Sequence, residues 1–212
     1  MVVAYAVKLG LRVIAITDHD CIDGALEASL CDPTRCEVVI GEEVTSRQGH
    51  ILGLFLSRPV AAGLDAEETI DEIHAQGGLA VPAHPYLQLG GARGVGSQAA
   101  GLSWDAIETE NGSPGAWFAN RQARRESSRW ARAQTGGSDA HILSAVGSVV
   151  TVFPGSTAAD LRDAIEGGAA RAKRQNRSPL IGALTLSRSL RRKLSGEAGR
   201  ELVRRRSRSP QP

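Results

Sequence analysis

Four of the five histidines in this sequence lie beside short apolar runs or a glycine turn. The run RVIAIT precedes His19, LAVPA precedes His84, GGSDA precedes His141, and HILGLFL begins at His50. Apolar, β-branched runs of this length predict buried strands, and α/β folds bind their ligands at the carboxyl ends of such strands. These four imidazoles are therefore candidates for chemistry.

Carboxylates accompany three of these histidines. The pairs are Asp18 with His19, Glu43 with His50, and Asp139 with His141. A tight turn at residues 47–49 would bring Glu43 and His50 to one rim of a sheet. Imidazole and carboxylate are donors that zinc, manganese and iron accept, and a cluster of such ions polarises phosphoryl groups. One histidine alone is more often structural, as we expect for His74 in its helical pattern, but this combination predicts a metal site.

The elements that must position these groups alternate between strand and helix. Strand patterns cover residues 12–17, 37–46, 50–56, 79–85, 106–111 and 146–153. Helix patterns cover residues 24–30, 64–78, 113–134 and 156–168. The predicted helix starts are the capping boxes Asp65/Glu68 and Thr157/Asp160, and the pair Ser113–Pro114. This alternation predicts a parallel α/β sheet or barrel, with the glycine-rich residues 88–101 long enough to form a flap over the site.

Composition indicates an ordinary globular body. Hydrophobic residues make up 42% of the 212 residues. No apolar run approaches the roughly 20 residues that a membrane-spanning helix needs, and no signal-peptide pattern is seen. Cys21, Cys31 and Cys36 lack the paired spacing of a zinc site, so we expect free thiols in a reducing cytoplasm.

Charge divides the chain into two parts. Residues 1–170 carry 12 Lys and Arg against 21 Asp and Glu, whereas residues 171–212 carry 13 against 2. We therefore expect a body at residues 1–172 and a basic extension at residues 173–212, disordered in its last part. The extension is either a solvated appendage or a segment that binds nucleic acid or another anionic surface. The sequence leaves the oligomeric state open.

A series of motifs carries a resemblance to a known family. The motifs are ITDHD, GEEVTS followed by GHILGLF, HAQGGLAVPAHP, AIETENG, and GGSDAH followed by VGSVVTVFPGSTAADLRDAI. In order and spacing they resemble the PHP (polymerase and histidinol phosphatase) domain of metal-dependent phosphoesterases, over about residues 1–172. The resemblance implies a distorted (β/α)7 TIM-like barrel, with up to three divalent metal ions at the carboxyl ends of the strands.

The resemblance also implies roles for individual residues. The implied metal ligands are His19, Glu43, His50, His84, Asp139 and His141. Glu43, rather than Glu42, would be the bridging carboxylate. The implied catalytic residues are Asp18, His19, Asp139 and His141, and the implied substrate-binding residues are Glu108 and Asn111.

The sequence departs from the family pattern at its beginning. The family opens with a strand that carries Asp-x-His-x-His, whereas this sequence begins with MVVAYAVKLGLRV, which resembles the second half of the first connecting helix. The expectation is a barrel without its first strand, fewer than three bound ions and weak turnover by the chain as written. A late start codon is preferred over a fragment or a loss of ligands, because every later motif is intact.

The function implied by the resemblance is metal-dependent hydrolysis of phosphate esters with manganese, zinc or iron. The candidate substrates are a small phosphomonoester or a nucleotide, including a nucleoside 3′,5′-bisphosphate, a short oligonucleotide and histidinol phosphate. The alternative is a catalytically impaired metal-binding module whose basic tail binds nucleic acid or a partner.

Overall fold

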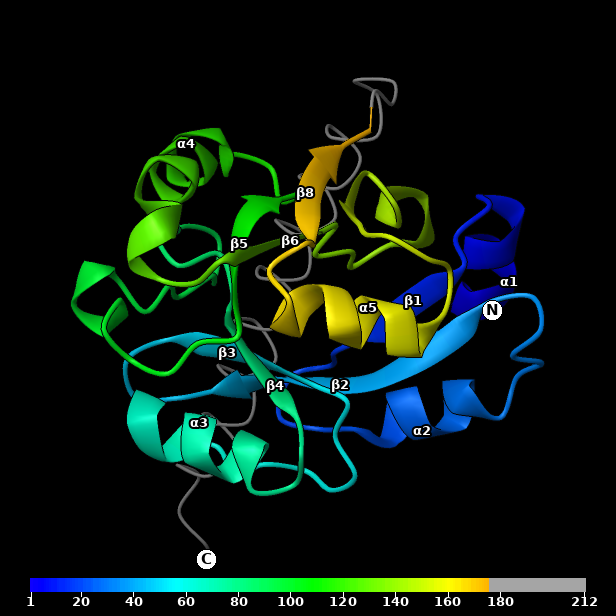
Figure 1. Cartoon of the computed structure of the whole chain (residues 1–212), viewed down its shortest axis with the longest axis horizontal. Coiled ribbons are helices and arrows are strands. Elements are labelled where there is room, and N and C mark those ends of the chain that lie inside the picture. The colour runs from blue at the N-terminus through cyan, green and yellow to red at the C-terminus, as the bar shows by residue number, and fades with distance from the viewer. Residues whose placement is uncertain (176–212) are drawn as a thin grey trace, which may run out of the picture.

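A computed structural model describes residues 1–175 of the chain (Figure 1). Its main sheet has four strands in the order β1 (Val13–Ile16), β2 (Glu37–Thr45), β3 (His50–Leu54) and β4 (Leu79–Pro82). β1 and β2 are parallel, but β2 pairs with β3, and β3 with β4, in antiparallel fashion. Within the described residues, no helix is both long and apolar enough to cross a membrane.

Two further strand pairs lie beside this sheet. β5 (Ala106–Asn111) and β6 (Ala133–Gly137) are parallel, and β7 (Val149–Val152) and β8 (Arg171–Arg174) are antiparallel. The fold is therefore mixed α/β, and the three sheets of the described residues form no closed barrel. The expected parallel sheet is wrong for β2, β3 and β4, whereas the tight turn predicted at residues 47–49 is confirmed as part of the β2–β3 hairpin. The four residues between β2 and β3 suffice for a hairpin but not for the crossover that parallel neighbours require.

Five α-helices surround these strands. They are α1 (Val2–Lys8), α2 (Asp23–Ser29), α3 (Ala66–His74), α4 (Trp117–Glu126) and α5 (Ala158–Glu166). Short 3-10 segments occur at Ser97–Ala99, Ser127–Arg129 and Leu143–Ala145. Both predicted capping boxes are confirmed: Asp65 and Glu68 cap α3, and Thr157 and Asp160 cap α5.

The long helix predicted over residues 113–134 is wrong. α4 begins at Trp117 and ends at Glu126, and β6 begins at Ala133. Ser113 cannot cap this helix, because its hydroxyl donates to Asp139 and the following Gly115 has φ +88°. After Glu126 a 3-10 segment follows at Ser127–Arg129, and Ala133–Gly137 form β6 because pairing with β5 overrides the local helical pattern.

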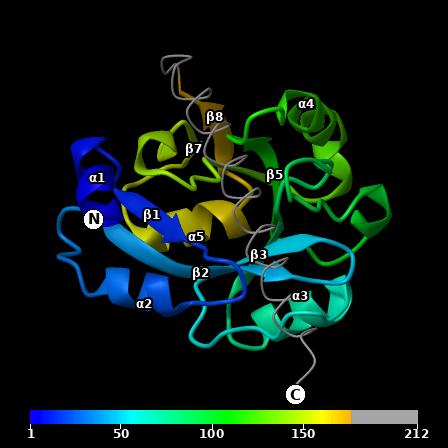
Figure 2. The same ribbon diagram turned by 180° about the vertical axis from the view of Figure 1, so that it is seen from behind.

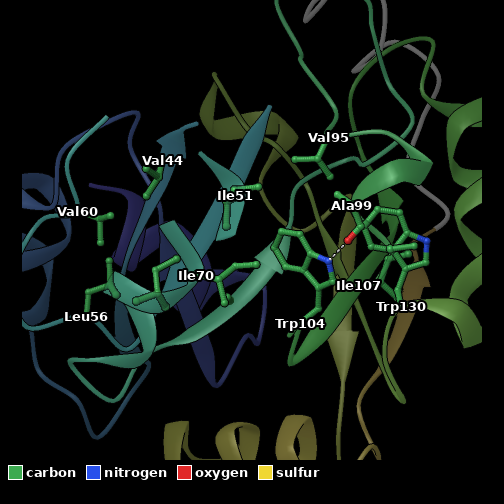
Figure 3. Packing of buried hydrophobic residues seen from close by; sticks show 14 of the residues in the cluster. Val44, Ile51, Leu56, Val60, Ile70, Val95, Ala99, Trp104, Ile107 and Trp130 are labelled. Atoms are coloured by element: carbon green, nitrogen blue, oxygen red, sulfur yellow. Dashed lines mark hydrogen bonds between the residues drawn. The ribbon is translucent and has the colours of Figure 1, made fainter. Parts of the chain in front are cut away.

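The core lies on two sides of the sheets. One cluster packs β2 and β3 against α3, β5 and Trp130, with Ile51, Ile70 and Ile107 at its centre (Figure 3). Trp104 adds a hydrogen bond from its indole to Ala99 O at 2.7 Å. The second cluster packs α5 across β2, β4 and β6, and Figure 1 shows α5 between the main sheet and β8. α5 therefore holds together strands that belong to different sheets.

Two sequence expectations concern segments outside these elements. In the loop at residues 88–101, Val95 is fully buried and His50 N donates to Arg93 O at 2.7 Å, so this part of the expected flap is packed against β3. The expected domain boundary after residue 172 falls inside β8, which pairs with β7. From residue 176 onward, the expected basic extension lies outside the described residues.

Candidate metal centre

The carboxylate of Glu43 lies among three imidazoles. His50 Nδ1 is 2.9 Å from Glu43 Oε1, His84 Nε2 is 3.2 Å from the same oxygen, and His19 Nε2 is 3.7 Å from Oε2. The imidazole of His50 lies edge-on to that of His19 and to that of His84, with ring centroids 4.9 and 5.4 Å apart. The four residues come from the ends of β1 and β4, from β2 and from the start of β3.

Backbone pairing sets this geometry. After β1 the chain continues beside β2, so that Glu43 N donates to Asp18 O and Asp20 N donates to Glu43 O. The β2–β3 hairpin pairs Thr45 with His50, which places the imidazole two residues from Glu43 along the ladder. Residues 18–20 thus run alongside β2, and the hairpin returns His50 to the same edge.

His84 reaches the centre through an unusual backbone conformation. Its φ is +33°, and its amide donates to Glu108 Oε2 at 2.6 Å. A residue other than glycine is strained at positive φ, and such strain persists only where surrounding contacts hold it. Asp139 and Asp20, at φ +46° and +52°, show the same feature beside the site.

The charges of these groups favour an ionised Glu43. Burial alone would raise the pKa of Glu43, but His50, His84 and His19 hold that pKa well below its ordinary value. For His84, burial lowers the pKa, and the stronger combined effect of Glu43, Glu108 and Asp139 raises it. An ionised carboxylate surrounded by imidazoles is a negative centre that attracts either protons on the rings or a metal cation.

The donor atoms present fit a divalent metal ion. One ligand atom each from His19, Glu43 and His50 lies within 4.8 Å of the others. The buried Nδ1 atoms of His50 and His84 have no hydrogen-bond partner, although His50 Nδ1 is close to Glu43. Buried polar atoms are normally paired, so the His50 nitrogen that faces the Glu43 carboxylate fits the role of a metal ligand. Two or three nitrogens with one carboxylate match the preference of zinc and related ions.

Asp139 and His141 lie to one side of this cluster. Asp139 follows β6 and accepts a 2.5 Å hydrogen bond from Ser113 Oγ, and it contributes to raising the pKa of both His84 and Glu108. His141 Nδ1 contacts Asp139 O at 3.1 Å, and the His141 side chain is 54% exposed. Within residues 1–175, His141 forms its ion pair with Asp139 and not with Glu43. The structure therefore brings Asp139 near His84 and leaves His141 at the surface.

Glu108 and Asn111 are buried and engaged with their neighbours. Glu108 Oε2 accepts from the amide of His84 and from Asn111 Nδ2, and Asn111 Oδ1 accepts from Ser113 N. Burial raises the pKa of Glu108 to about 7, although the charge of His84 and these hydrogen bonds lower it. In this arrangement both side chains hold His84 and Ser113 in place. Their expected substrate contacts stay a prediction.

Glu42, Asp18 and His74 lie outside the cluster around Glu43. Glu42 faces the opposite side of β2 from Glu43, is fully buried and accepts from Val60 N at 2.8 Å. Asp18 is exposed, and its carboxylate lies close to Gly24. His74 Nε2 lies 2.8 Å from Asp105 Oδ2, in agreement with a structural role.

Two residues that support the site were given no specific role in it from the sequence. Asp20 Oδ1 accepts from Thr45 N at 2.7 Å and so joins the end of β1 to β2. Ser113, expected as a helix cap, instead donates to Asp139. A sequence signal existed for Asp20, which is the second carboxylate of TDHD. The contact between Ser113 and Asp139 joins residues 26 positions apart and left no local signal.

Comparisons with known proteins give a consistent result. A family model described as PHP-associated (PHP_C) matches residues 117–170. MJ1587 of Methanocaldococcus jannaschii is 41% identical over 107 residues, which cover 50% of this chain and 61% of that protein. MJ0417 of the same organism is 29% identical over 83 residues, covering 37% of this chain and 35% of that protein. The chain thus spans less than two thirds of each of these relatives.

Three solved structures share the fold at low sequence identity. PsfC from Pseudomonas syringae has a TM-score of 0.63 and 19% identity, covering 89% of this chain and 87% of PsfC. A Bacteroides vulgatus two-domain protein containing a predicted PHP-like metal-dependent phosphoesterase scores 0.57 at 17% identity, covering 81% of this chain and 60% of that one. The lesion-specific endonuclease EndoQ from Pyrococcus furiosus has a TM-score of 0.51 and 19% sequence identity. The match covers 81% of this chain and 52% of EndoQ.

The site and the comparisons point in the same direction as the sequence motifs. The histidines and carboxylates of TDHD, GEEVTS and PAHP come together around Glu43. The family model matches the part of the chain that follows them, and the fold is shared with PHP-like phosphoesterases. Residues 117–170 are therefore similar to the PHP-associated family, and the chain shares its fold with a protein that contains a predicted PHP-like phosphoesterase.

Proposed function

We propose that this protein hydrolyses phosphate esters with a divalent metal ion held by Glu43, His50, His84 and His19. The observation that carries the proposal is the buried Glu43 carboxylate within 2.9 to 3.7 Å of three imidazole nitrogens. Further support comes from the shared fold, since one neighbour contains a predicted metal-dependent phosphoesterase and another is an endonuclease. Both kinds of enzyme act on phosphate esters.

The protein groups would take distinct parts in this reaction. An ion bound there would supply positive charge to a phosphoryl oxygen and would acidify a water molecule. Glu43 would bind the ion together with His50 and His84, and its negative charge would balance part of the charge of the ion. Exposed His19 and Asp18 lie at the open side, where a substrate phosphate can approach. Asp139, held by Ser113, can accept or return a proton there, and His141 at the surface can donate one to the leaving oxygen.

The finer details are part of the same proposal. We expect manganese, zinc or iron as the ion, because the donors are nitrogen and carboxylate oxygen. The substrate is a small phosphomonoester or a nucleotide, with a nucleoside 3′,5′-bisphosphate, a short oligonucleotide and histidinol phosphate as candidates. The distorted (β/α)7 barrel and the residue roles inherited from the resemblance stay predictions.

One alternative has a specific observation in its favour. In the part of the chain that the structure describes, the His141 side chain is 54% exposed and contacts Asp139 rather than Glu43. A centre that holds one ion without these groups would bind metal and turn over little substrate. Such a protein would be a metal-binding module, with its basic tail available for nucleic acid or a partner.

Turnover of a chromogenic ester separates the two functions. The protein is incubated with bis(p-nitrophenyl) phosphate or p-nitrophenyl phosphate and with manganese, zinc or iron. We expect weak, metal-dependent release of p-nitrophenol that His50→Ala lowers by at least about 100-fold. His74→Ala, which changes a histidine outside the centre, is the matched control and should retain turnover. Metal bound at the site with no turnover under any of the three metals would support the alternative.

A further inference from the structure

Helix α4 exposes its largest apolar side chains instead of burying them. Trp117 and Phe118 are 58% and 65% exposed, and their rings are stacked with planes inclined by 30°. The helix is attached to the body by the small or polar residues Asn120 and Ala123, which are its buried positions. A helix that turns its aromatic residues to solvent presents a surface for a ligand rather than a packing face.

Two arginines extend this aromatic pair along the helix. Trp117, Arg121 and Arg125 are spaced four residues apart and so lie along one stripe. Arg121 and Arg125 line a hollow of about 520 Å³ together with Phe118 and Tyr86. Within the described residues, neither arginine has an ion-pair partner, whereas the neighbouring Arg124 pairs with Glu110. These two guanidinium groups are therefore available for an anion.

One carboxylate shares the hollow, but it is already engaged. Glu126 lines the same space and accepts from Tyr86 and Arg129 at 3.0 and 3.1 Å. Its charge is therefore partly balanced by Arg129. α4 itself contains three arginines and this one glutamate, so the face has positive character.

Direct contacts connect α4 to the candidate metal centre. Asn120 Oδ1 accepts from Asn111 N, Asn111 Nδ2 donates to Glu108, and Glu108 accepts from the amide of His84. Ser113, four residues before Trp117, donates to Asp139. In Figure 1, β5 leads directly into this region and α4 follows it. These contacts run through buried side chains and join α4 to the residues that follow β5 and β6.

We infer that the α4 face formed by Trp117, Phe118, Arg121 and Arg125 binds single-stranded nucleic acid and presents one of its phosphodiesters to the Glu43 centre. The inference rests on the proposed function, because it names the substrate class of the same site. Unpaired bases stack on exposed aromatic rings, and arginines contact the phosphates between them. A duplex keeps its base faces stacked inside and offers nothing to Trp117 and Phe118.

A second copy of the chain is less suited to bind this face than single-stranded nucleic acid is. A symmetric contact through Trp117 and Phe118 would place Arg121 and Arg125 of one copy near the same arginines of the other. Like charges that approach in this way are unfavourable. The positive character of the face selects an anionic partner.

Binding is measured by fluorescence anisotropy with the full chain, a fluorescein-labelled twelve-nucleotide oligothymidine and excess EDTA. Arg121→Gln/Arg125→Gln and Trp117→Ala each change one component of the face. We expect Trp117→Ala to weaken binding by about tenfold, as the loss of one stacked base would. The arginine double variant should lower the slope of log affinity against log salt by about 1.4, at about 0.7 for each lost phosphate contact.

A charge-matched control is available at the other end of the molecule. Arg12→Gln/Arg35→Gln removes two positive charges from exposed residues near the starts of β1 and β2. Both views place the connection from α2 to β2 far from α4 (Figures 1 and 2). This control should bind the oligonucleotide like the unchanged chain, and circular dichroism checks that every variant is folded.

Three outcomes overturn the inference. The first is unchanged affinity in both α4 variants, which would place any nucleic-acid binding elsewhere, for example in the basic extension. The second is an equal loss in the Arg12→Gln/Arg35→Gln control. The third is a dimer in sedimentation velocity that Trp117→Ala dissociates without changing oligonucleotide affinity.

The test also separates this inference from the proposed function. Binding is measured without metal, so a chain that binds the oligonucleotide through α4 and never hydrolyses bis(p-nitrophenyl) phosphate supports this surface and contradicts the proposed function. A chain that hydrolyses this ester but has an affinity that α4 variants leave unchanged contradicts the inference alone.

Discussion

Glu42 and Glu43 are neighbours in β2, yet the strand gives them opposite surroundings. Successive side chains of a strand point to opposite faces, so Glu43 meets His50 and His84 while Glu42 is enclosed behind the sheet near Val60. Burial raises the pKa of Glu42, whereas the imidazoles lower that of Glu43. Adjacent positions in β2 therefore hold a candidate metal ligand, Glu43, and a buried structural acid, Glu42.

Glu108 should make the stability of the metal-free protein depend on pH. Its pKa is raised to about 7 in the folded chain, against an ordinary value of 4.5, chiefly by burial. A raised acid pKa means that the folded state binds more protons than the unfolded state, so stability falls as pH rises through this window. In urea unfolding with EDTA, Glu108→Gln should gain stability relative to the unchanged chain between about pH 4.5 and pH 7.

Glu27→Gln, at an exposed position of α2, controls for the loss of one negative charge. A Glu108→Gln difference that stays constant across this window would contradict the assignment of a protonated buried Glu108.

The residue pattern predicted the members of the site better than their arrangement. The motifs indicated His19, Glu43, His50 and His84, and these four do come together. The positive φ of His84 and Asp139 was not predictable, because neither residue is glycine and the strain is held by contacts distant in sequence. The outward position of His141 likewise depends on the path of the chain after β6.

At the scale of elements, local signals succeeded where local interactions decide the structure. The capping boxes of α3 and α5 satisfy backbone amides within one turn, and both were predicted correctly. The helix expected over residues 113–134 failed, since Ala133–Gly137 gain a parallel partner in β5 that no local pattern reveals. The expected boundary after residue 172 divides Arg171–Arg174, which pair with β7 as β8.

The turn that carries His84 should depend on Gly94. A Cβ atom at Gly94 would overlap Pro85 O and lie 2.6 Å from His84 O, so alanine must displace this turn. We expect Gly94→Ala to destabilise the fold by about 1–3 kcal/mol, as overpacking does, and to weaken metal binding through His84. Urea unfolding and a metal titration measure the two effects.

Gly101→Ala is the matched control, because a Cβ atom there would have no neighbour within 4 Å. It should change stability by no more than about 0.5 kcal/mol. Equal behaviour of the two variants would contradict the proposed contact between the loop and the His84 turn.

At the scale of the whole molecule, the site depends on the assembly of separate strand ends. His19, Glu43, His50 and His84 come from or follow four successive strands, and α5 packs across β2, β4 and β6 behind them. Composition and alternation predicted an α/β body, but not its division into three sheets. The mixture of parallel and antiparallel pairs depends on the path of each connection, which no single segment encodes.

The most direct test of the account is the metal content of Glu43→Gln after dialysis, measured by mass spectrometry of the protein loaded with manganese or zinc. Glu42→Gln, which removes the neighbouring carboxylate on the other face of β2, is the control, and circular dichroism confirms that both variants fold. We predict about one tightly held ion per chain in the unchanged protein and in Glu42→Gln, and loss of that ion in Glu43→Gln. Equal metal content in both variants, or no bound metal in the unchanged protein, would contradict a metal centre at Glu43.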